Sequence, residues 1–317
     1  MGKTDTVLHD FLRDEARFAD LYNGGWFEGK EIILPGELSE LDGRYGLADA
    51  EAEGQKPPGT RSRDVKKLYR DQAVLRILAV ENQTEVDYTM PWRCMDYDVR
   101  EYERQIRKLR QQNRDRGDLR PGGEFLCGLK KEDRLIPVYT LCVYYGENPW
   151  DGPRSLRDMM ALGQAPSEWE KWFKDYPFHL ICANEWKQKE VFRTSLREVF
   201  GVLPCRGDKE RLRRALRENP AYRKLDEDTF RTLAVLLGEK KIMIPKKKEK
   251  EEGLDMCKAL EDIWQEGIDI GIEKGIGQIV RNMLKRGMAD EEIMALAECS
   301  REVLERIRQN GQKMEGM

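Results

Sequence analysis

Apolar residues recur at helical spacing at both ends of the chain and in short continuous runs between them. Within residues 5–22 they repeat at intervals of three and four, which predicts an amphipathic helix with one apolar side formed by Val7, Leu8, Phe11, Phe18, Leu21 and Tyr22. The glycine-rich triplet that follows, residues 23–25, predicts the end of that helix. After Val191 the pattern is again helical almost to the C-terminus.

The runs in between predict strands. Glu31–Leu34 is expected as a short strand that stops at Pro35-Gly36. Residues 63–69 have an extended pattern, and a turn at Asp71-Gln72 separates them from the apolar run of residues 73–84. Two such runs joined by a short polar turn predict a β-hairpin.

A long polar helix and two further strands follow the hairpin. Pro91 suits the first turn of a helix and predicts one over residues 91–113. Residues 135–146 form a continuous apolar run that ends in glycine, typical of a strand buried on both faces, and residues 178–183 form another. The order predicts an α/β fold with a mixed sheet flanked by helices, followed by an all-helical C-terminal region.

This organisation predicts three segments along the chain. A core over residues 1–195 contains the sheet and carries a Gly-, Pro- and acid-rich insertion near residues 42–60. Residues 196–250 form a helical extension that ends in the charged linker PKKKEKEE. Residues 251–317 form a C-terminal helical tail.

Composition narrows the chemistry that such a fold can carry. Charged residues make up 36% of the chain and the net charge is −3, which favours a soluble globular protein with solvated helices. The seven cysteines stand singly and form no CxxC pair, so we expect reduced thiols, no structural zinc and a cytoplasmic protein. The first 20 residues are charged and lack an apolar core, and no apolar run is long enough for a membrane span, so we expect neither a signal peptide nor a span. Only His9 and His179 are present, so hydrolysis would depend on carboxylates, which suit Mg²⁺ or Mn²⁺.

Three polar residues on the hairpin carry the candidate chemistry. Asp64 lies on the first arm and Glu81 ends the second, so antiparallel pairing can bring them face to face. Gln83 lies two residues beyond Glu81 and therefore points to the same face of the strand. Two carboxylates can hold a divalent cation for phosphodiester cleavage, and a third polar group can position water or phosphate. The alternative is a strand end whose polar residues are merely solvated.

The segment RSRDVKKLYRDQAVLRILAVENQTEVDY resembles the catalytic segment of the PD-(D/E)XK nucleases, in the form found in the Rpn family of recombination-promoting nucleases and transposase-like proteins. The matching positions are Asp64, the run Ile77–Val80 and Glu81-Asn82-Gln83. Similarity continues in DEARFADLYN, MPWRCMDYDVREYERQI, LIPVYTLCVYYGENPWDGPRSLRDM and EGIDIGIEKGIG, so it covers most of the chain.

This resemblance implies a PD-(D/E)XK-type core and a metal-dependent DNA endonuclease linked to recombination, mobile elements or defence against foreign DNA. Asp64, Glu81 and Gln83 would be its catalytic residues. Asp64 and Glu81 would also hold Mg²⁺ or Mn²⁺.

Two positions depart from the wider PD-(D/E)XK pattern. Arg63 precedes Asp64 where the pattern has proline, and Gln83 replaces its lysine. A glutamine carries no positive charge and cannot act as a base, so the proton acceptor is unassigned. Three acids of the first predicted helix are candidate accessory groups or simply solvated positions: Asp5, Asp10 and Asp20.

Basic residues flank the first of the candidate acids, and contacts of this kind bind the phosphates of DNA. The group consists of Arg61, Arg63, Lys66 and Lys67. A solvated strand or helix face with acidic partners is the competing interpretation of these charges.

The C-terminal tail has a regular glycine spacing. Gly267, Gly271 and Gly275 recur every four residues beside isoleucines, and each glycine inside a helix costs about 1 kcal/mol relative to alanine. The spacing therefore predicts close helix packing, either within the chain or between the subunits of a homo-oligomer. Residues 279–310 resemble a small helix-turn-helix unit.

We therefore expect a metal-dependent DNA endonuclease. The competing interpretation is a non-catalytic DNA-binding or assembly protein that keeps the nuclease fold and uses its C-terminal helices for partners. The presence of Asp64, Glu81 and Gln83 together favours the enzyme.

Overall fold

The computed structural model describes residues 3–41, 44–45, 61–62, 64–162, 168–238 and 253–315. The chain divides into two compact units, the first comprising Met1–Lys240 with Ile244–Leu254, and the second Lys241–Met243 with Asp255–Met317. Apart from Arg44–Tyr45, the predicted insertion near 42–60 lies outside the described residues, as does the charged linker at 245–252. None of the described helices is long and apolar enough to cross a bilayer.

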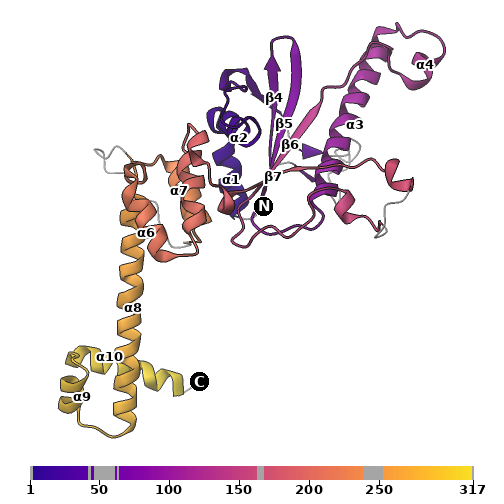
Figure 1. Cartoon of the computed structure of the whole chain (residues 1–317). Coiled ribbons are helices and arrows are strands. Elements are labelled where there is room, and N and C mark those ends of the chain that lie inside the picture. Colours follow the sequence, from indigo (N-terminus) through magenta and orange to yellow (C-terminus); the bar gives the residue numbers. More distant parts are fainter. Residues whose placement is uncertain are drawn as a thin grey trace. The chain divides into compact units, whose positions relative to one another are not determined.

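The first unit is built on a mixed five-stranded sheet, which confirms the α/β class (Figure 1). Its strand order is β1-β4-β5-β6-β7. The pairings of β1 with β4 and of β4 with β5 are antiparallel, and those of β5 with β6 and of β6 with β7 are parallel. The strands span Leu38–Glu40 (β1), Val65–Asp71 (β4), Val74–Gln83 (β5), Val138–Tyr144 (β6) and His179–Cys182 (β7). A separate pair joins Arg44–Tyr45 (β2) to Arg61–Ser62 (β3).

The predicted hairpin is confirmed as β4 and β5. Val65 pairs with Val80 and Asp71 with Val74, so the turn lies at Gln72 and Ala73, one residue beyond the predicted position. Gln72 has a φ of 52°, a left-handed conformation that completes a tight reversal. The second arm continues as a central strand of the sheet, which explains its long apolar run.

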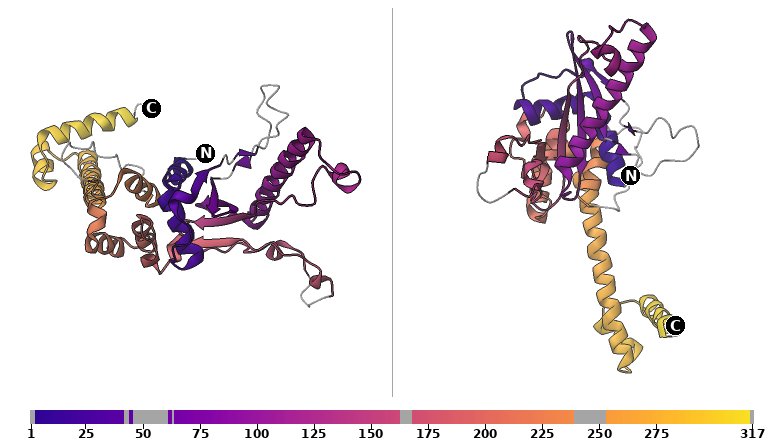
Figure 2. Two further views of the ribbon diagram at one scale, coloured as in Figure 1. Left: turned by 90° about the horizontal axis from the view of Figure 1, so that it is seen from above. Right: turned by 90° about the vertical axis from the view of Figure 1, so that its right-hand side faces the viewer.

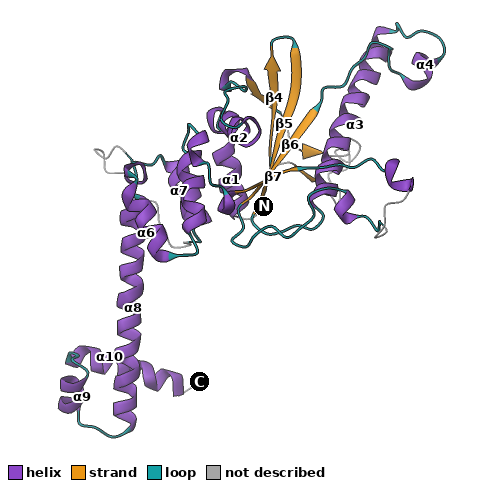
Figure 3. Ribbon diagram, in the orientation of Figure 1, coloured by secondary structure: helices purple, strands orange, loops and turns teal. Residues whose placement is uncertain are grey.

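Helices cover both faces of this sheet (Figures 2 and 3). On one face lie α1 (Lys3–Arg13) and α2 (Glu15–Phe27), where the Tyr22 hydroxyl donates to the carbonyl oxygen of Ala79 at 2.7 Å. On the other lies α3 (Met90–Arg116), the predicted polar helix with Pro91 in its first turn. Thr140 of β6 donates to Asp98 of α3 at 2.9 Å and marks the side of the sheet that α3 covers.

The single helix predicted over residues 5–22 is two helices in the structure, and the predicted stop at residues 23–25 is wrong. The predicted helix breaks at Asp14, whose side chain accepts from Arg17 N and begins a new helix. That helix runs through Gly24 and Gly25 instead of stopping there. A Cβ on Gly24 would lie 2.3 Å from Phe192 Cε1, and one on Gly25 would lie 2.4 Å from Ile181 Cδ1. These glycines allow close packing and do not terminate the helix.

The predicted strand at residues 31–34 is also wrong. The side chain of Asn23 accepts from the backbone N–H groups of Ile32 and Ile33 and donates to the carbonyl oxygen of Ile33. Backbone groups satisfied in this way do not need a neighbouring strand. The strand that forms this edge of the sheet is β1, which begins after a 3₁₀ turn at Pro35–Glu37.

Short helices complete the first unit: α4 (Gly123–Cys127), α5 (Leu196–Val202), α6 (Lys209–Glu218) and α7 (Glu227–Leu236). The predicted extension at 196–250 is therefore part of the first unit as far as it is described, because α7 packs against α1 and α5 against α2. Leu225 and Leu254 also exchange two backbone hydrogen bonds.

The second unit consists of α8 (Met256–Lys285), α9 (Asp290–Leu296) and α10 (Arg301–Glu315). Its core is formed by Val280, Ile293, Leu304 and Ile307. Of the two alternatives for the tail glycines, close packing within the chain is not found among the described residues, because a Cβ on Gly267, Gly271 or Gly275 would meet nothing within 4 Å.

Candidate active site

Asp64 and Glu81 lie at one end of the hairpin. The register that pairs Val65 with Val80 places Asp64 opposite Glu81 when it is continued by one residue. Asp64 is half-buried, and its Oδ2 accepts from the backbone N–H of Asn82 at 2.7 Å. Directly opposed residues of antiparallel strands point to the same face. The local register therefore brings the two predicted acids together.

Glu81 is the more deeply buried of the two, with 1% of its surface exposed. Arg93, on the first turn of α3, places Nη2 at 3.7 Å from Glu81 Oε2. Its other terminal nitrogen donates to Asp87 Oδ2 at 2.6 Å. Burial alone would lower the pKa of Arg93, but the Asp87 hydrogen bond and the charges of Tyr97, Glu81 and Asp87 outweigh it and raise that pKa. Arg93 is therefore a fixed cation between two carboxylates.

Gln83 occupies the last position of β5 and is half-buried. It pairs with Tyr144 of β6, and its carbonyl oxygen accepts from Tyr145 N at 2.7 Å. Alternation along the strand places its side chain on the same face as that of Glu81. All three predicted residues thus lie at one end of the sheet, on the side that α3 covers.

The first helix also contributes to the electrostatics of this site. Burial raises the pKa of the Asp64 carboxyl, and the negative charge of Asp5 raises it further. The hydrogen bond from Asn82 and the positive charges of Arg93 and His9 act in the opposite direction. A carboxylate with a raised pKa gains from a nearby cation.

Tyr97 lies one helical turn beyond Arg93 and is 4% exposed. The Arg93 guanidinium stands 5.9 Å from the centre of the Tyr97 ring. Burial and then the negative charge of Glu81 raise the pKa of the Tyr97 hydroxyl, so it remains protonated near neutral pH. It can act as a hydrogen-bond donor on the same face as the two acids.

The carboxylate oxygens of Asp64 and Glu81 are the type of ligand that a hard divalent cation prefers. Among the described residues no three His, Cys, Asp or Glu side chains gather into a group that could hold a metal ion. Magnesium, however, is often bound by only one or two carboxylates, with waters and phosphate oxygens completing its coordination. Asp64 and Glu81 meet that smaller requirement, because Asp64 engages Oδ2 with Asn82 and can offer Oδ1.

No protein-family model, curated protein or solved structure matches this chain. The chemical interpretation of the site therefore depends on the residues themselves.

Two of the predicted DNA contacts are corrected by the structure. Lys66 is 3% exposed, and its Nζ lies 3.0 Å from Glu101 Oε2. Lys67 is 1% exposed, and its Nζ donates to the carbonyl oxygen of Arg13 at 2.8 Å. Both ammonium groups are engaged inside the protein and are not presented to a phosphate backbone.

The remaining predicted DNA contacts are not described at the level of side chains. Arg61 belongs to β3, but its side chain lies outside the described part of the chain, and so does the whole of Arg63.

The three candidate accessory acids have different surroundings. Asp20 is 6% exposed and accepts from the backbone N–H groups of Arg193 and Thr194, so it holds a loop in place. Asp10 is exposed beside His9, at 3.2 Å. Asp5 is the one whose charge acts on Asp64.

Arg93, Tyr97 and Asp87 were not predicted from the sequence. A signal for two of them was present, because Arg93 and Tyr97 are four residues apart near the start of a predicted helix and so share one face. What the sequence did not provide was the rotation of that helix about its axis, which decides whether this face meets the sheet.

Proposed function

We propose that this protein is a metal-dependent endonuclease that hydrolyses DNA phosphodiester bonds on a core of the PD-(D/E)XK type. The observation that carries the proposal is the meeting of Asp64 and Glu81 across the β4–β5 hairpin, beside the fixed guanidinium of Arg93. The seven cysteines are all free, which accords with a cytoplasmic site of action.

Each side chain has a distinct role in this proposal. Asp64 is oriented by Asn82 N–H and, with Glu81, would hold Mg²⁺ or Mn²⁺. When bound, such a cation supplies charge neutralisation at the phosphoryl group and a more acidic water. Gln83 donates and accepts hydrogen bonds and orients the attacking water or a phosphate oxygen without taking its proton.

Arg93 provides the positive charge that Gln83 lacks. In the wider PD-(D/E)XK pattern a lysine stands at the position of Gln83. Here the cation comes from α3, and Asp87 holds its guanidinium in place. The Arg93 guanidinium, which lies beside Glu81 and Asp87, can donate to an equatorial oxygen of the scissile phosphate, where charge develops.

The test is nicking of supercoiled plasmid by the purified chain with Mg²⁺ or Mn²⁺, with and without EDTA. We expect metal-dependent nicking that EDTA abolishes and that Asp64→Asn or Glu81→Gln abolishes without unfolding the protein. Asp71→Asn is the matched control, because it changes an acid at the opposite end of the same hairpin. Equal nicking by all variants would refute the site.

The same experiment addresses the non-catalytic alternative. A protein that shifts DNA in a gel but never nicks it, with any of the metals, would be a DNA-binding or assembly protein on a nuclease-like fold.

A further inference from the structure

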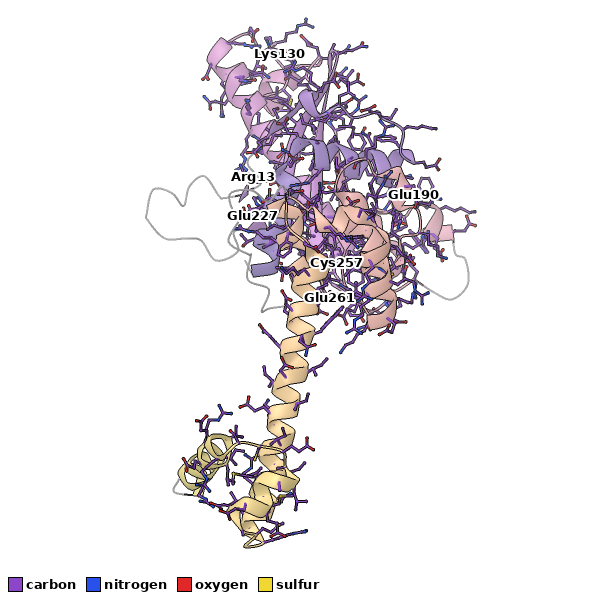
Figure 4. The ribbon with its side chains drawn as sticks, turned by 90° about the vertical axis from the view of Figure 1, so that its left-hand side faces the viewer. Arg13, Lys130, Glu190, Glu227, Cys257 and Glu261 are labelled. Carbon is purple, nitrogen blue, oxygen red and sulfur yellow. The ribbon has the colours of Figure 1, made fainter. Side chains whose placement is uncertain are left out.

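The middle of α8 exposes isoleucines to solvent. Ile268, Ile272 and Ile279 are 52%, 57% and 50% exposed, and every residue from Gln265 to Gly275 is exposed. Figure 4 shows α8 with its side chains drawn as sticks, and labels Cys257 and Glu261 near the start of the helix. Large apolar side chains left in water at regular intervals mark an interaction surface.

These isoleucines lie on one line along the helix. Residues 268, 272, 275 and 279 are separated by four, three and four positions, the spacing at which one helix presents a continuous seam to another. We call Ile268, Ile272, Gly275 and Ile279 the α8 seam. Helix α10 packs against the neighbouring side of α8, around Val280, and its Arg306 pairs with Glu273. Ile272 lies at the rim of the hollow between α8 and α10 but remains 57% exposed, so α10 does not cover the seam.

We propose that the α8 seam pairs with the α8 seam of a second copy of this chain, with the two helices antiparallel. A two-fold axis between Glu273 and Lys274 places Ile268 against Ile279 at both ends of the seam. The same axis places Ile272 against Gly275. A glycine opposite an isoleucine leaves room for the larger side chain, since a Cβ on Gly275 has no neighbour within 4 Å in the single chain.

Charge decides between antiparallel and parallel pairing. Extending the seam by two turns towards the N-terminus reaches Glu261, and extending it towards the C-terminus reaches Arg286; both are exposed. The antiparallel arrangement brings Glu261 of one copy to Arg286 of the other at both ends. A parallel pair would bring Glu261 to Glu261 and Arg286 to Arg286, and like charges at facing positions are unfavourable.

The first experiment measures the mass of the full-length chain by light scattering across a concentration series up to about 100 µM, since so short a seam implies affinity in the micromolar range. We expect a monomer–dimer equilibrium. Ile272→Glu should raise the dissociation constant by at least about tenfold, because it places a carboxylate in the apolar contact. Ile270→Glu is the matched control, since Ile270 is 42% exposed on the opposite side of the same helix.

The second experiment tests direction. Glu261→Lys and Arg286→Glu should each weaken the dimer, and the double variant should restore it, since the charges are then exchanged between facing positions. A parallel dimer would not be rescued. A chain that stays monomeric at the highest concentration, or that is weakened equally by Ile272→Glu and Ile270→Glu, overturns the seam; failure of the double variant to rescue overturns the antiparallel arrangement. Circular dichroism of each variant confirms that α8 remains helical.

Discussion

At the scale of single residues, the proposed function divides between Gln83 and Arg93 a role that one lysine has in the wider PD-(D/E)XK pattern. Gln83→Ala should slow single-turnover cleavage at saturating Mg²⁺ and leave metal affinity largely unchanged, because an amide positions but does not ligate in this arrangement. Gln83→Lys should keep measurable activity. Gln83→Glu should be slower than Gln83→Lys, because a third carboxylate repels the phosphate.

The proposed role of Arg93 gives this series an internal control. Arg93→Ala should lower the cleavage rate, and Arg93→Ala combined with Gln83→Lys should recover part of the loss, since the lysine returns a cation to the site. If the double variant is no faster than Arg93→Ala alone, the charge of Arg93 serves the fold and not the substrate. Wild-type rates in Gln83→Ala would place Gln83 among the solvated residues of the strand end.

A second prediction at this scale concerns the buried pair of Glu101 and Lys66. Burial by itself would raise the pKa of Glu101, but the hydrogen bond from Arg104 and the charge of Lys66 lower it overall. Because the folded pKa lies below the unfolded one, the stabilisation is complete above about pH 4.3 and is lost as the pH falls through the folded value.

Glu101→Gln should therefore lower the free energy of unfolding at pH 7 by about 3–5 kcal/mol, because it removes one charge of a buried ion pair. It should also make the free energy of unfolding depend less steeply on pH below about pH 4.3. Urea unfolding between neutral and acidic pH measures both effects. The control is Glu103→Gln, an exposed position on the same helix; an equal response of the two variants would contradict the prediction.

At the scale of elements, α2 shows how packing overrides a helix-stop signal. Helix α2 continues through Gly24, and Phe192 fills the space that a side chain at this position would need. Gly24→Ala should lower the free energy of unfolding by about 1–3 kcal/mol, the usual cost of overpacking, although alanine is the better helix former.

Gly36→Ala provides the comparison for α2. A Cβ on Gly36 would meet nothing within 4 Å, so its effect should remain within about 0.5 kcal/mol. Denaturant midpoints of the two variants and the wild type give the result directly. An unchanged or raised midpoint in Gly24→Ala would mean that Phe192 moves aside at little cost.

At the scale of the whole molecule, the chain forms two compact units with separate cores. Leu304 is fully buried in the second and Leu233 in the first. Leu304→Ala should lower the free energy of unfolding of the second unit by about 2–5 kcal/mol, and Leu233→Ala should do the same for the first unit, because a cavity destabilises the unit that contains it. In calorimetry each variant should lower the midpoint temperature of only one of two unfolding transitions. A single transition that responds equally to both changes would show that the units unfold together.

The sequence alone was sufficient for the elements whose signals are local. The hairpin, the helix that begins near Pro91 and the central strand at 138–144 each follow from spacing and turn residues within one segment, and the structure has them where they were expected. Asp64, Glu81 and Gln83 could be placed at one strand end for the same reason, since the two-residue period of a strand and the antiparallel register are local rules.

Tertiary structure alone decided the features that depend on what lies across from a residue. Lys66 and Lys67 are adjacent charged residues that look like surface positions in the sequence, yet β4 has a covered face on each side, so both are buried on opposite sides of the sheet. The same applies to Gly24 beside Phe192, Asn23 beside Ile33 and Arg93 beside Glu81. Each partner is distant in the chain or set by a helix rotation, and only folding brings the two within contact distance.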